Sequence, residues 1–203
     1  KTLSSPLPAR RLLPDSQKRV REIRDLKAAI FLPSRPGFIP TPRPKNGSTI
    51  AKGLSYQRGW TLSVRAGTLS GFESHRLFLG TNPMAFEVRP EQWFCFEDSN
   101  GVGYAESDLL LVVPSLHLAF VFECKRTHTD RGLVQLGQLY LPLVRYILTG
   151  YHVFGLLVCQ NLDPQMNRRY LLNQISDWFD ILEKAIFEGR PRAVPLHSLC
   201  WRQ

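Results

Sequence analysis

Two apolar runs separated by a short Pro-Ser turn constrain the fold of this chain most. The runs are Leu109–Val113 and Leu118–Phe122, and Pro114 and Ser115 lie between them. Apolar stretches of this length, bounded by a turn signal, are typical of buried strands that are joined as a β-hairpin. We therefore expect a hairpin that belongs to a buried hydrophobic sheet.

The predicted hairpin carries charged residues at the ends of its strands. Asp108 opens the first strand, and Glu123-Cys124-Lys125 ends the second. Side chains alternate faces along a strand, so Glu123 and Lys125 point one way and Cys124 points the other. Two carboxylates and an ammonium in this place suit a hard divalent cation and a phosphate, which is a nuclease-like arrangement. The competing interpretation is a solvated hairpin end whose charges prevent edge-to-edge association.

Asp108, Glu123-Cys124-Lys125 and a following helix that carries Gln135 and Tyr140 resemble the PD-(D/E)XK nuclease superfamily, also called restriction-endonuclease-like. The phage-type exonucleases and recombination nucleases look most similar, over residues 51–187. The resemblance implies an α/β fold with a restriction-endonuclease-like core, in which helices flank a mixed central β-sheet. It also implies a deoxyribonuclease that depends on Mg²⁺ or Mn²⁺ and acts in phage or mobile-element recombination, repair or genome processing.

The same resemblance implies roles for individual residues. Asp108 and Glu123 would bind the metal, together with the backbone carbonyl of Cys124. Lys125 would assist the attacking water as the catalytic lysine. Gln135 would correspond to the glutamine that this branch of the superfamily carries on the helix after the hairpin.

Three positions leave alternatives open. Gln138 competes with Gln135 for the role of the helix glutamine. Glu106 faces the same side of its strand as Asp108, so it is either a third acid for the metal or the partner of an arginine. Gln57 stands where the family often has a glutamate on its first core helix, and an amide brings no negative charge to a metal. A non-catalytic nucleic-acid-binding module on the same fold is therefore the alternative function.

Positive charge is concentrated in an N-terminal arm. Residues 1–45 hold eleven Lys and Arg against three acids, a net of +8 within a whole-chain charge of +9. Each phosphate that such an arm neutralises releases counterions, so the arm predicts contact with DNA. The alternative is an arm that tethers an interaction subunit to a larger nucleoprotein complex. The residues expected at DNA are Arg10, Arg11, Lys18, Arg19, Arg21 and Arg24 in the arm, and Arg58 and Arg65 in the core.

The pattern of apolar and turn residues divides the chain into two parts. Residues 1–48 are expected to hold a basic helix over 16–31 and a Pro-rich linker, and residues 49–203 the nuclease-like domain. Trp60 would either stack on an unpaired base or pack in the core, and the core is favoured for both Trp60 and Tyr140. The elements expected in the domain are a helix over 49–66, strands over 92–97, 104–113 and 117–125, a helix over 130–148, a strand over 152–159 and a helix over 164–187.

The composition narrows the remaining classes of protein. An apolar content of 43% is enough for a real core, and no run approaches the length of a membrane span. The four cysteines show no Cys-x-x-Cys spacing, which argues against a zinc site and a disulfide scaffold. We expect a cytoplasmic protein, in the host cytoplasm if it is phage-encoded, with DNA as partner and no membrane. The resemblance leaves open whether it acts as a homo-oligomer or within a nucleoprotein complex.

Overall fold

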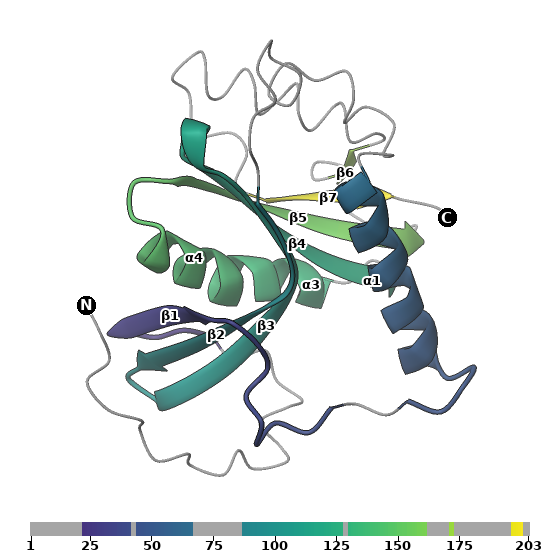
Figure 1. Cartoon of the computed structure of the whole chain (residues 1–203), viewed down its shortest axis with the longest axis horizontal. Coiled ribbons are helices and arrows are strands. Elements are labelled where there is room, and N and C mark those ends of the chain that lie inside the picture. Colours follow the sequence, from purple (N-terminus) through teal and green to yellow (C-terminus); the bar gives the residue numbers. More distant parts are fainter. Residues whose placement is uncertain are drawn as a thin grey trace.

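The computed structural model describes residues 22–41, 44–66, 87–127 and 130–161, and the backbone of 171–172 and 196–200. The chain forms an α/β fold around one open, mixed sheet (Figure 1). Seven strands are described, in the spatial order β1-β2-β3-β4-β5-β7-β6. Within these ranges no helix has the length and apolar character that a membrane crossing requires.

One half of the sheet is antiparallel and the other is parallel. The antiparallel half contains β1 (Ala28–Leu32), β2 (Glu87–Asp98), β3 (Gly101–Val113) and β4 (Leu118–Thr127). The parallel half adds β5 (His152–Asn161), β7 (Leu196–Cys200) and β6 (Leu171–Leu172). The predicted hairpin is confirmed, because β3 and β4 pair across a 3₁₀ turn at Pro114–Leu116.

The first helix of the core, α1, runs over Thr49–Ala66, as the sequence predicts. Ser48 caps it, since its Oγ accepts a hydrogen bond of 3.2 Å from the backbone N–H of Ala51. Trp60 is fully buried, and its ring centroid lies 5.9 Å from that of Phe122 on β4. Trp60 therefore anchors α1 to the sheet, which confirms the core assignment and leaves no ring face for a base.

The second helical segment follows β4 and also matches its predicted range. It consists of α3 (Asp130–Gln135), a π-helical turn (Leu136–Tyr140) and α4 (Leu141–Ile147). Pro142 directly follows the π-helical turn, in which the N–H of Leu141 donates to the carbonyl of Leu136. Val121 packs in one apolar cluster with Leu136, whereas its neighbour Phe122 packs against Trp60. Since neighbouring side chains on a strand point to opposite faces, α1 and α3–α4 cover opposite faces of the sheet.

The expected arm is only partly separate from the domain. The helix predicted over 16–31 is wrong where the structure describes it, because Ala28–Leu32 form β1 and pair antiparallel with β2. The sheet therefore begins before the expected boundary at residue 48. Residues 22–27 also attach to the domain, since the N–H of Lys27 donates to the carbonyl of Glu97 at 2.8 Å. Residues 16–21 lie outside the described residues.

The long helix predicted over 164–187 is not continuous. Leu171 and Leu172 form the short strand β6, which pairs in parallel with β7. Apolar residues at helical spacing could not reveal this pairing, because its partner strand lies about two dozen residues further along the chain. The rest of the predicted helix lies outside the described residues.

Gly132 allows α3 to approach the sheet closely. A Cβ atom at this position would lie 2.7 Å from Cδ1 of Leu157 on β5, and Leu157 is fully buried. Gly137, one turn later, has no heavy atom within 4 Å of the corresponding point. We expect Gly132→Ala to lower the free energy of unfolding by about 1–3 kcal/mol through overpacking. Gly137→Ala is the matched control and should be neutral or stabilising, because alanine favours helix more than glycine does. Urea denaturation of both variants measures the difference, and equal effects would contradict the close approach.

Candidate active site

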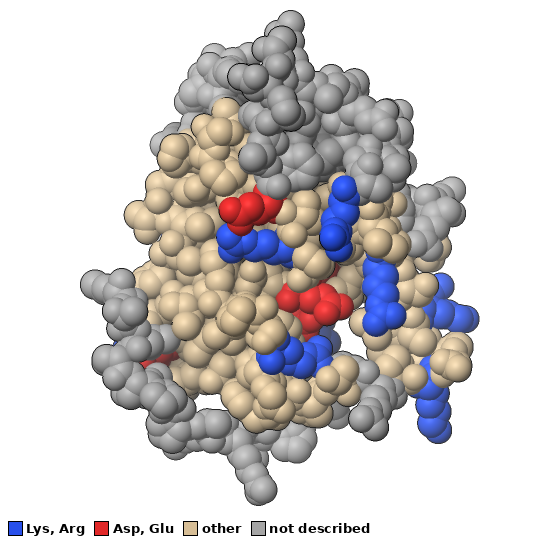
Figure 2. Space-filling model, in the orientation of Figure 1, with Lys and Arg blue, Asp and Glu red and all other residues tan. Residues whose placement is uncertain are grey.

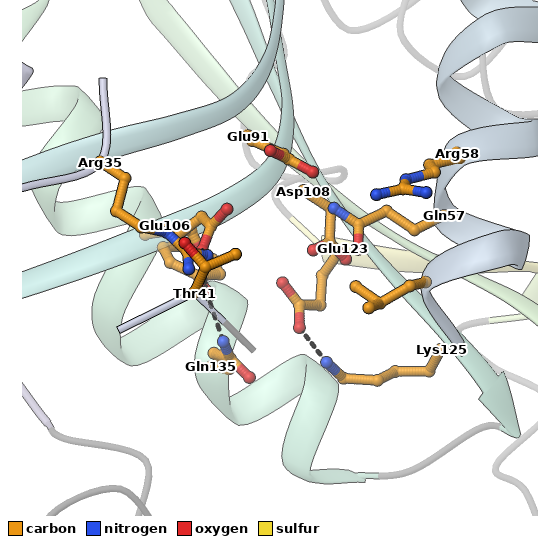
Figure 3. A pocket seen from close by; sticks show the side chains of 12 residues that line it. Arg35, Thr41, Gln57, Arg58, Glu91, Glu106, Asp108, Glu123, Lys125 and Gln135 are labelled. Atoms are coloured by element: carbon orange, nitrogen blue, oxygen red, sulfur yellow. Dashed lines mark hydrogen bonds and ion pairs between the residues drawn. The ribbon is translucent and has the colours of Figure 1, made fainter. Parts of the chain in front are cut away.

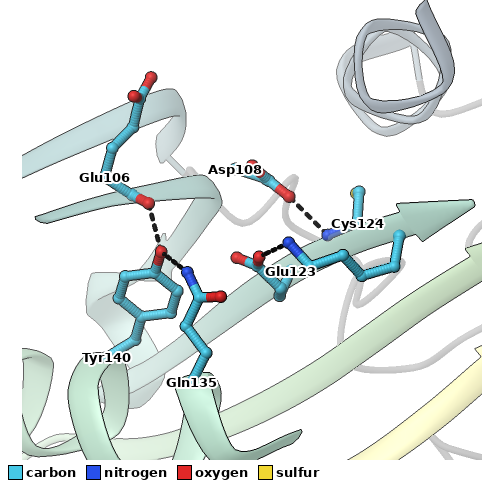
Figure 4. Close-up of polar contacts among 7 residues, drawn as sticks. Glu106, Asp108, Glu123, Cys124, Gln135 and Tyr140 are labelled. Atoms are coloured by element: carbon cyan, nitrogen blue, oxygen red, sulfur yellow. Dashed lines mark hydrogen bonds and ion pairs between the residues drawn. The ribbon is translucent and has the colours of Figure 1, made fainter. Parts of the chain in front are cut away.

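Asp108 and Glu123 meet where β3 and β4 part. The last pair of these strands is Leu109 with Phe122, so the two acids are the first residues beyond the paired section. The backbone N–H of Cys124 donates to Oδ2 of Asp108 at 2.5 Å, which joins the strands across the opening (Figure 4). The separation of the strands thus brings together two carboxylates that are 15 residues apart in the sequence.

Glu123 is the most deeply buried charged group of the site. Its side chain is 2% exposed, and Oε1 forms an ion pair with Nζ of Lys125 (Figure 4). Its other oxygen, Oε2, is buried and has no hydrogen-bond partner among the described residues. Burial raises the pKa of Glu123 to about 8, the negative charge of Asp108 adds to this, and Lys125 opposes it. A buried carboxylate oxygen without a partner is costly unless a cation or a proton satisfies it.

Lys125 remains an ammonium at this place. Burial lowers its pKa, but the negative charges of Glu123 and Asp108 outweigh burial, so that the net shift is upward. Burial raises the pKa of Asp108 to about 6, against the opposing effects of Lys125 and of the Cys124 N–H. With a raised pKa, Lys125 is suited to hold a phosphate oxygen or a water molecule by donation, and not to accept a proton as a general base.

These residues lie in an open pocket of about 510 Å³. Figure 2 shows acidic side chains in a hollow of the surface with Lys and Arg side chains around them, and Figure 3 shows the lining from close by. α1 contributes to one side of the pocket, and β2, β3, β4 and the helical segment after β4 contribute to the other sides. The lining residues are Arg35, Thr41, Leu54, Gln57, Arg58, Glu91, Glu106, Asp108, Glu123, Lys125, Gln135 and Tyr140.

Gln135 is the glutamine that the helix presents to the pocket, whereas Gln138 is exposed and does not line it. Nε2 of Gln135 donates to the hydroxyl of Tyr140 at 2.5 Å, and that hydroxyl in turn donates to the backbone carbonyl of Glu106 (Figure 4). Tyr140 is 2% exposed, which confirms the core assignment. Its hydroxyl nevertheless orients the amide of Gln135, because the amide nitrogen donates to it. The amide oxygen is then left to accept a hydrogen bond from water.

Glu106 is paired with an arginine. Its Oε2 lies 3.3 Å from an Nη atom of Arg35, and both side chains are 24% exposed. Burial raises the pKa of Glu106 to about 6, and Arg35 opposes that shift. The structure thus favours the ion-pair interpretation of Glu106. Gln57 lines the same pocket from α1, as expected for the first-helix position.

The residues predicted to contact DNA lie in different places. Arg58 lines the pocket, whereas Arg65 is exposed in the last turn of α1 and does not line it. Arg24 lies at the β2–β3 turn, where its backbone carbonyl accepts from the N–H of Ser99 at 2.9 Å, and its side chain is 3.7 Å from Glu22. Asp108 lies seven residues along β3 from its start at that turn, and Arg24 does not line the pocket. Arg10, Arg11, Lys18, Arg19 and Arg21 lie outside the described residues.

Sequence reasoning missed two charged residues of the pocket, Arg35 and Glu91. Arg35 belongs to the Pro-rich segment that the sequence predicts to be a linker. Glu91 interrupts β2 with a left-handed φ of 48°, an uncommon conformation for glutamate, and lies opposite Asp108 in the register set by the pairs Pro90–Leu109 and Gln92–Ser107. A left-handed residue next to a charged site is a recurrent feature of functional sites, but it has no sequence signal that distinguishes it from a residue of an ordinary Pro-containing strand.

The residues present fit a small divalent cation. Across the described ranges no three His, Cys, Asp and Glu side chains cluster closely enough to hold a metal between them. Mg²⁺ commonly takes only one or two carboxylates and keeps several waters. Asp108 and Glu123 match that requirement, and the unpartnered Oε2 of Glu123 is an oxygen that a cation would satisfy. The carbonyl of Cys124 as a further ligand stays a prediction.

Comparisons with known proteins give little further information. No model of a known protein family matches the chain, and no curated protein sequence does. A solved structure of a Type III CRISPR defence DNA nuclease activated by cyclic oligoadenylate matches 60% of this chain at 19% sequence identity, with a TM-score of 0.28. The chain spans 21% of that protein's length. A likeness at this level carries no argument about fold or function, so a functional assignment rests on the residues of the pocket.

Proposed function

We propose that this protein is a metal-dependent DNA nuclease with a restriction-endonuclease-like core. The observation that carries the proposal is the buried, unpartnered Oε2 of Glu123 in an open pocket that Asp108 also lines, while the other oxygen of that carboxylate pairs with Lys125. An acid pair beside a protonated lysine is costly to bury and has no evident structural benefit here. It is well suited to hold a cation and a phosphate together.

The chain's own residues would divide the work as follows. Asp108 and Glu123 would hold Mg²⁺ or Mn²⁺ with the Cys124 carbonyl. When bound, the ion would lower the pKa of a coordinated water and polarise the phosphate. Lys125 would donate to a phosphate oxygen and stabilise the charge that develops there during attack. The amide oxygen of Gln135, oriented by Tyr140, would accept a hydrogen bond from the attacking water and so orient it.

DNA as the substrate is proposed from charge. Arg35, Arg58 and Lys125 surround the acids of the pocket, and residues 1–45, which include Arg35, carry a net charge of +8. Phosphate contacts of this kind supply most of the affinity of non-specific binding to DNA. A role in phage or mobile-element recombination, or in repair, remains a prediction from the family resemblance.

A second function is favoured by one observation, the neutral Gln57 at the pocket wall. Without an acid at this position the pocket would offer a metal one negative charge fewer, and a DNA-binding protein without cleavage activity would be the result. A Gln57→Glu variant separates the two functions, because it restores the acid without altering Asp108, Glu123 or Lys125.

The test is a panel of linear, circular, single-stranded and branched DNA, incubated with the native chain and with the Gln57→Glu variant. We expect cleavage of at least one substrate with Mg²⁺ or Mn²⁺, by the variant if not by the native chain, and none in EDTA. The substrate that is cleaved fastest identifies the preferred DNA structure. Cleavage that persists in EDTA would contradict the metal mechanism. Cleavage by the variant alone, or binding without cleavage by both proteins, would favour the second function for the native chain.

A further inference from the structure

Arg35 is held at the pocket by three contacts. One Nη atom is 3.3 Å from Oε2 of Glu106, the other donates to the carbonyl of Pro40 at 3.1 Å, and the guanidinium lies over the Trp93 ring, 5.1 Å from its centroid. Trp93 and Glu106 are themselves opposite each other in the β2–β3 register. Arg35, which precedes α1 by more than a dozen residues, is thus oriented by a cross-strand pair of the sheet, and Figure 3 shows it beside Glu106 of that pair.

The guanidinium of Arg35 has more N–H donors than its hydrogen bonds to the described residues use. It carries five N–H groups, and two hydrogen bonds to the described residues account for two of them. The contact to Glu106 is a single long bond, whereas arginine and a carboxylate in optimal geometry form two parallel bonds. The side chain is also 24% exposed, so its free edge can be reached from solvent. The planar fork of donors in a guanidinium matches the geometry of a phosphate.

The acids that line the pocket create a need for cationic donors if DNA is to bind there. Four carboxylates line the pocket, those of Glu91, Glu106, Asp108 and Glu123. A DNA strand that enters it is repelled by each of these groups that is ionised, unless cations are closer. In Figure 3 Arg35 and Arg58 lie on opposite sides of these acids, one before α1 and one on it. A strand that crosses the pocket would therefore meet an arginine on each side of the acidic centre.

We infer that Arg35 is a phosphate-binding residue for the DNA backbone, and that Glu106 is the partner it leaves when DNA binds. The inference rests on the proposed function only in taking DNA as the ligand. In the free protein Glu106 occupies one donor of the guanidinium and holds it beside the pocket. On binding, the guanidinium remains on Trp93 and exchanges the carboxylate for a phosphate. Glu106 thus weakens DNA binding by competing for Arg35.

The test measures equilibrium binding of a fluorescent oligonucleotide, single-stranded and duplex, by anisotropy in EDTA. Arg35→Ala should weaken binding about tenfold, the loss of one charge-assisted hydrogen bond. Glu106→Gln should strengthen binding several-fold. In the Arg35→Ala background Glu106→Gln should give no comparable gain, since the arginine that it releases is absent. Arg35→Lys, which keeps the charge and loses the planar fork, should be intermediate, and it replaces Arg35→Ala if that variant unfolds.

Two matched controls isolate the effect. Glu91→Gln also removes one carboxylate from the pocket. Because Arg35 pairs with Glu106 and not with Glu91, this variant reports the gain in affinity from charge alone. Arg89 on β2 is built like Arg35, since it pairs with Glu87 and lies 5.1 Å from the Phe31 centroid, yet it does not line the pocket. Arg89→Ala should therefore change affinity much less than Arg35→Ala does.

Three results would overturn the inference. Weaker binding by both Arg35→Ala and Glu106→Gln would mean that the pair only ties the segment before α1 to the sheet. If the gain in DNA affinity from Glu106→Gln persisted without Arg35, or if Glu91→Gln gave an equal gain, the loss of one negative charge would explain it without any competition for Arg35. A wild-type protein that binds no DNA would overturn it together with the proposed function. A protein that binds DNA with the expected pattern and does not cleave it would contradict only the nuclease proposal.

Discussion

Glu123→Ala is expected to abolish metal-dependent cleavage while leaving DNA affinity within about twofold of the wild type. The substitution removes a proposed metal ligand and the partner of Lys125, but no residue proposed to contact phosphate. Bound metal contributes several kcal/mol of charge stabilisation, so the rate should fall by about a thousandfold or more. Single-turnover cleavage and anisotropy, measured on the same DNA, separate the two effects.

Glu87→Ala is the matched control for this variant. Glu87 is an acid of the same sheet that pairs with Arg89 at the surface and does not line the pocket. Its loss should leave the cleavage rate unchanged, because exposed ion pairs contribute little to stability. Equal losses of binding and cleavage in Glu123→Ala, with a lowered melting temperature, would point to a folding defect and away from metal binding. Full cleavage by Glu123→Ala would show that the site is wrongly assigned.

Removal of residues 1–21 is expected to weaken DNA affinity without regard to sequence and to flatten its dependence on salt. The segment holds six Lys and Arg against one acid. Each phosphate contact that is lost lowers the magnitude of the log–log salt slope by about 0.9 on duplex DNA, so loss of all six would lower it by about five. Titrations at several salt concentrations measure the slope.

The position of this truncation follows from the structure. A cut after Lys45 would also remove β1, an edge strand that pairs with β2 over five residues, and Arg35 with it. A cut before Glu22 leaves β1 and the contacts of residues 22–27 in place. Cleavage at low salt should therefore survive the truncation. An unchanged slope would indicate that the arm serves a protein partner, which is the alternative interpretation of its charge.

The sequence predicts the part of the fold whose signals are local. The β3–β4 hairpin rests on two uninterrupted apolar runs around a turn, and the bounds of α1 agree with the predicted helix over 49–66. Strand alternation alone predicts that the side chains of Glu123 and Lys125 point to the same face of the sheet. The ion pair between them agrees with this prediction. Within the pocket, the proximity of Asp108, Glu123 and Lys125 is therefore predictable from hairpin geometry and strand alternation.

What the sequence could not predict depends on distant pairing. Ala28–Leu32 continue a run with helical spacing, but their partner strand β2 lies more than 50 residues away, and tertiary pairing overrides local propensity. Arg35 reaches the pocket only because β1 places the following segment beside Trp93 and Glu106. Glu91 lies opposite Asp108 in a left-handed backbone conformation. None of these three features has a signal within its own neighbourhood of the chain.

The central claim is that Asp108 and Glu123 together hold the metal ion on which cleavage depends. Crystals of the wild-type protein and of Glu123→Gln, both soaked in Mn²⁺, test it most directly through the anomalous scattering of manganese. The account predicts a peak in the wild type that is bonded to a carboxylate oxygen of Asp108 and to Oε2 of Glu123, and no such peak in Glu123→Gln. A wild-type pocket without manganese, or a peak that persists at the same place in the variant, would contradict it.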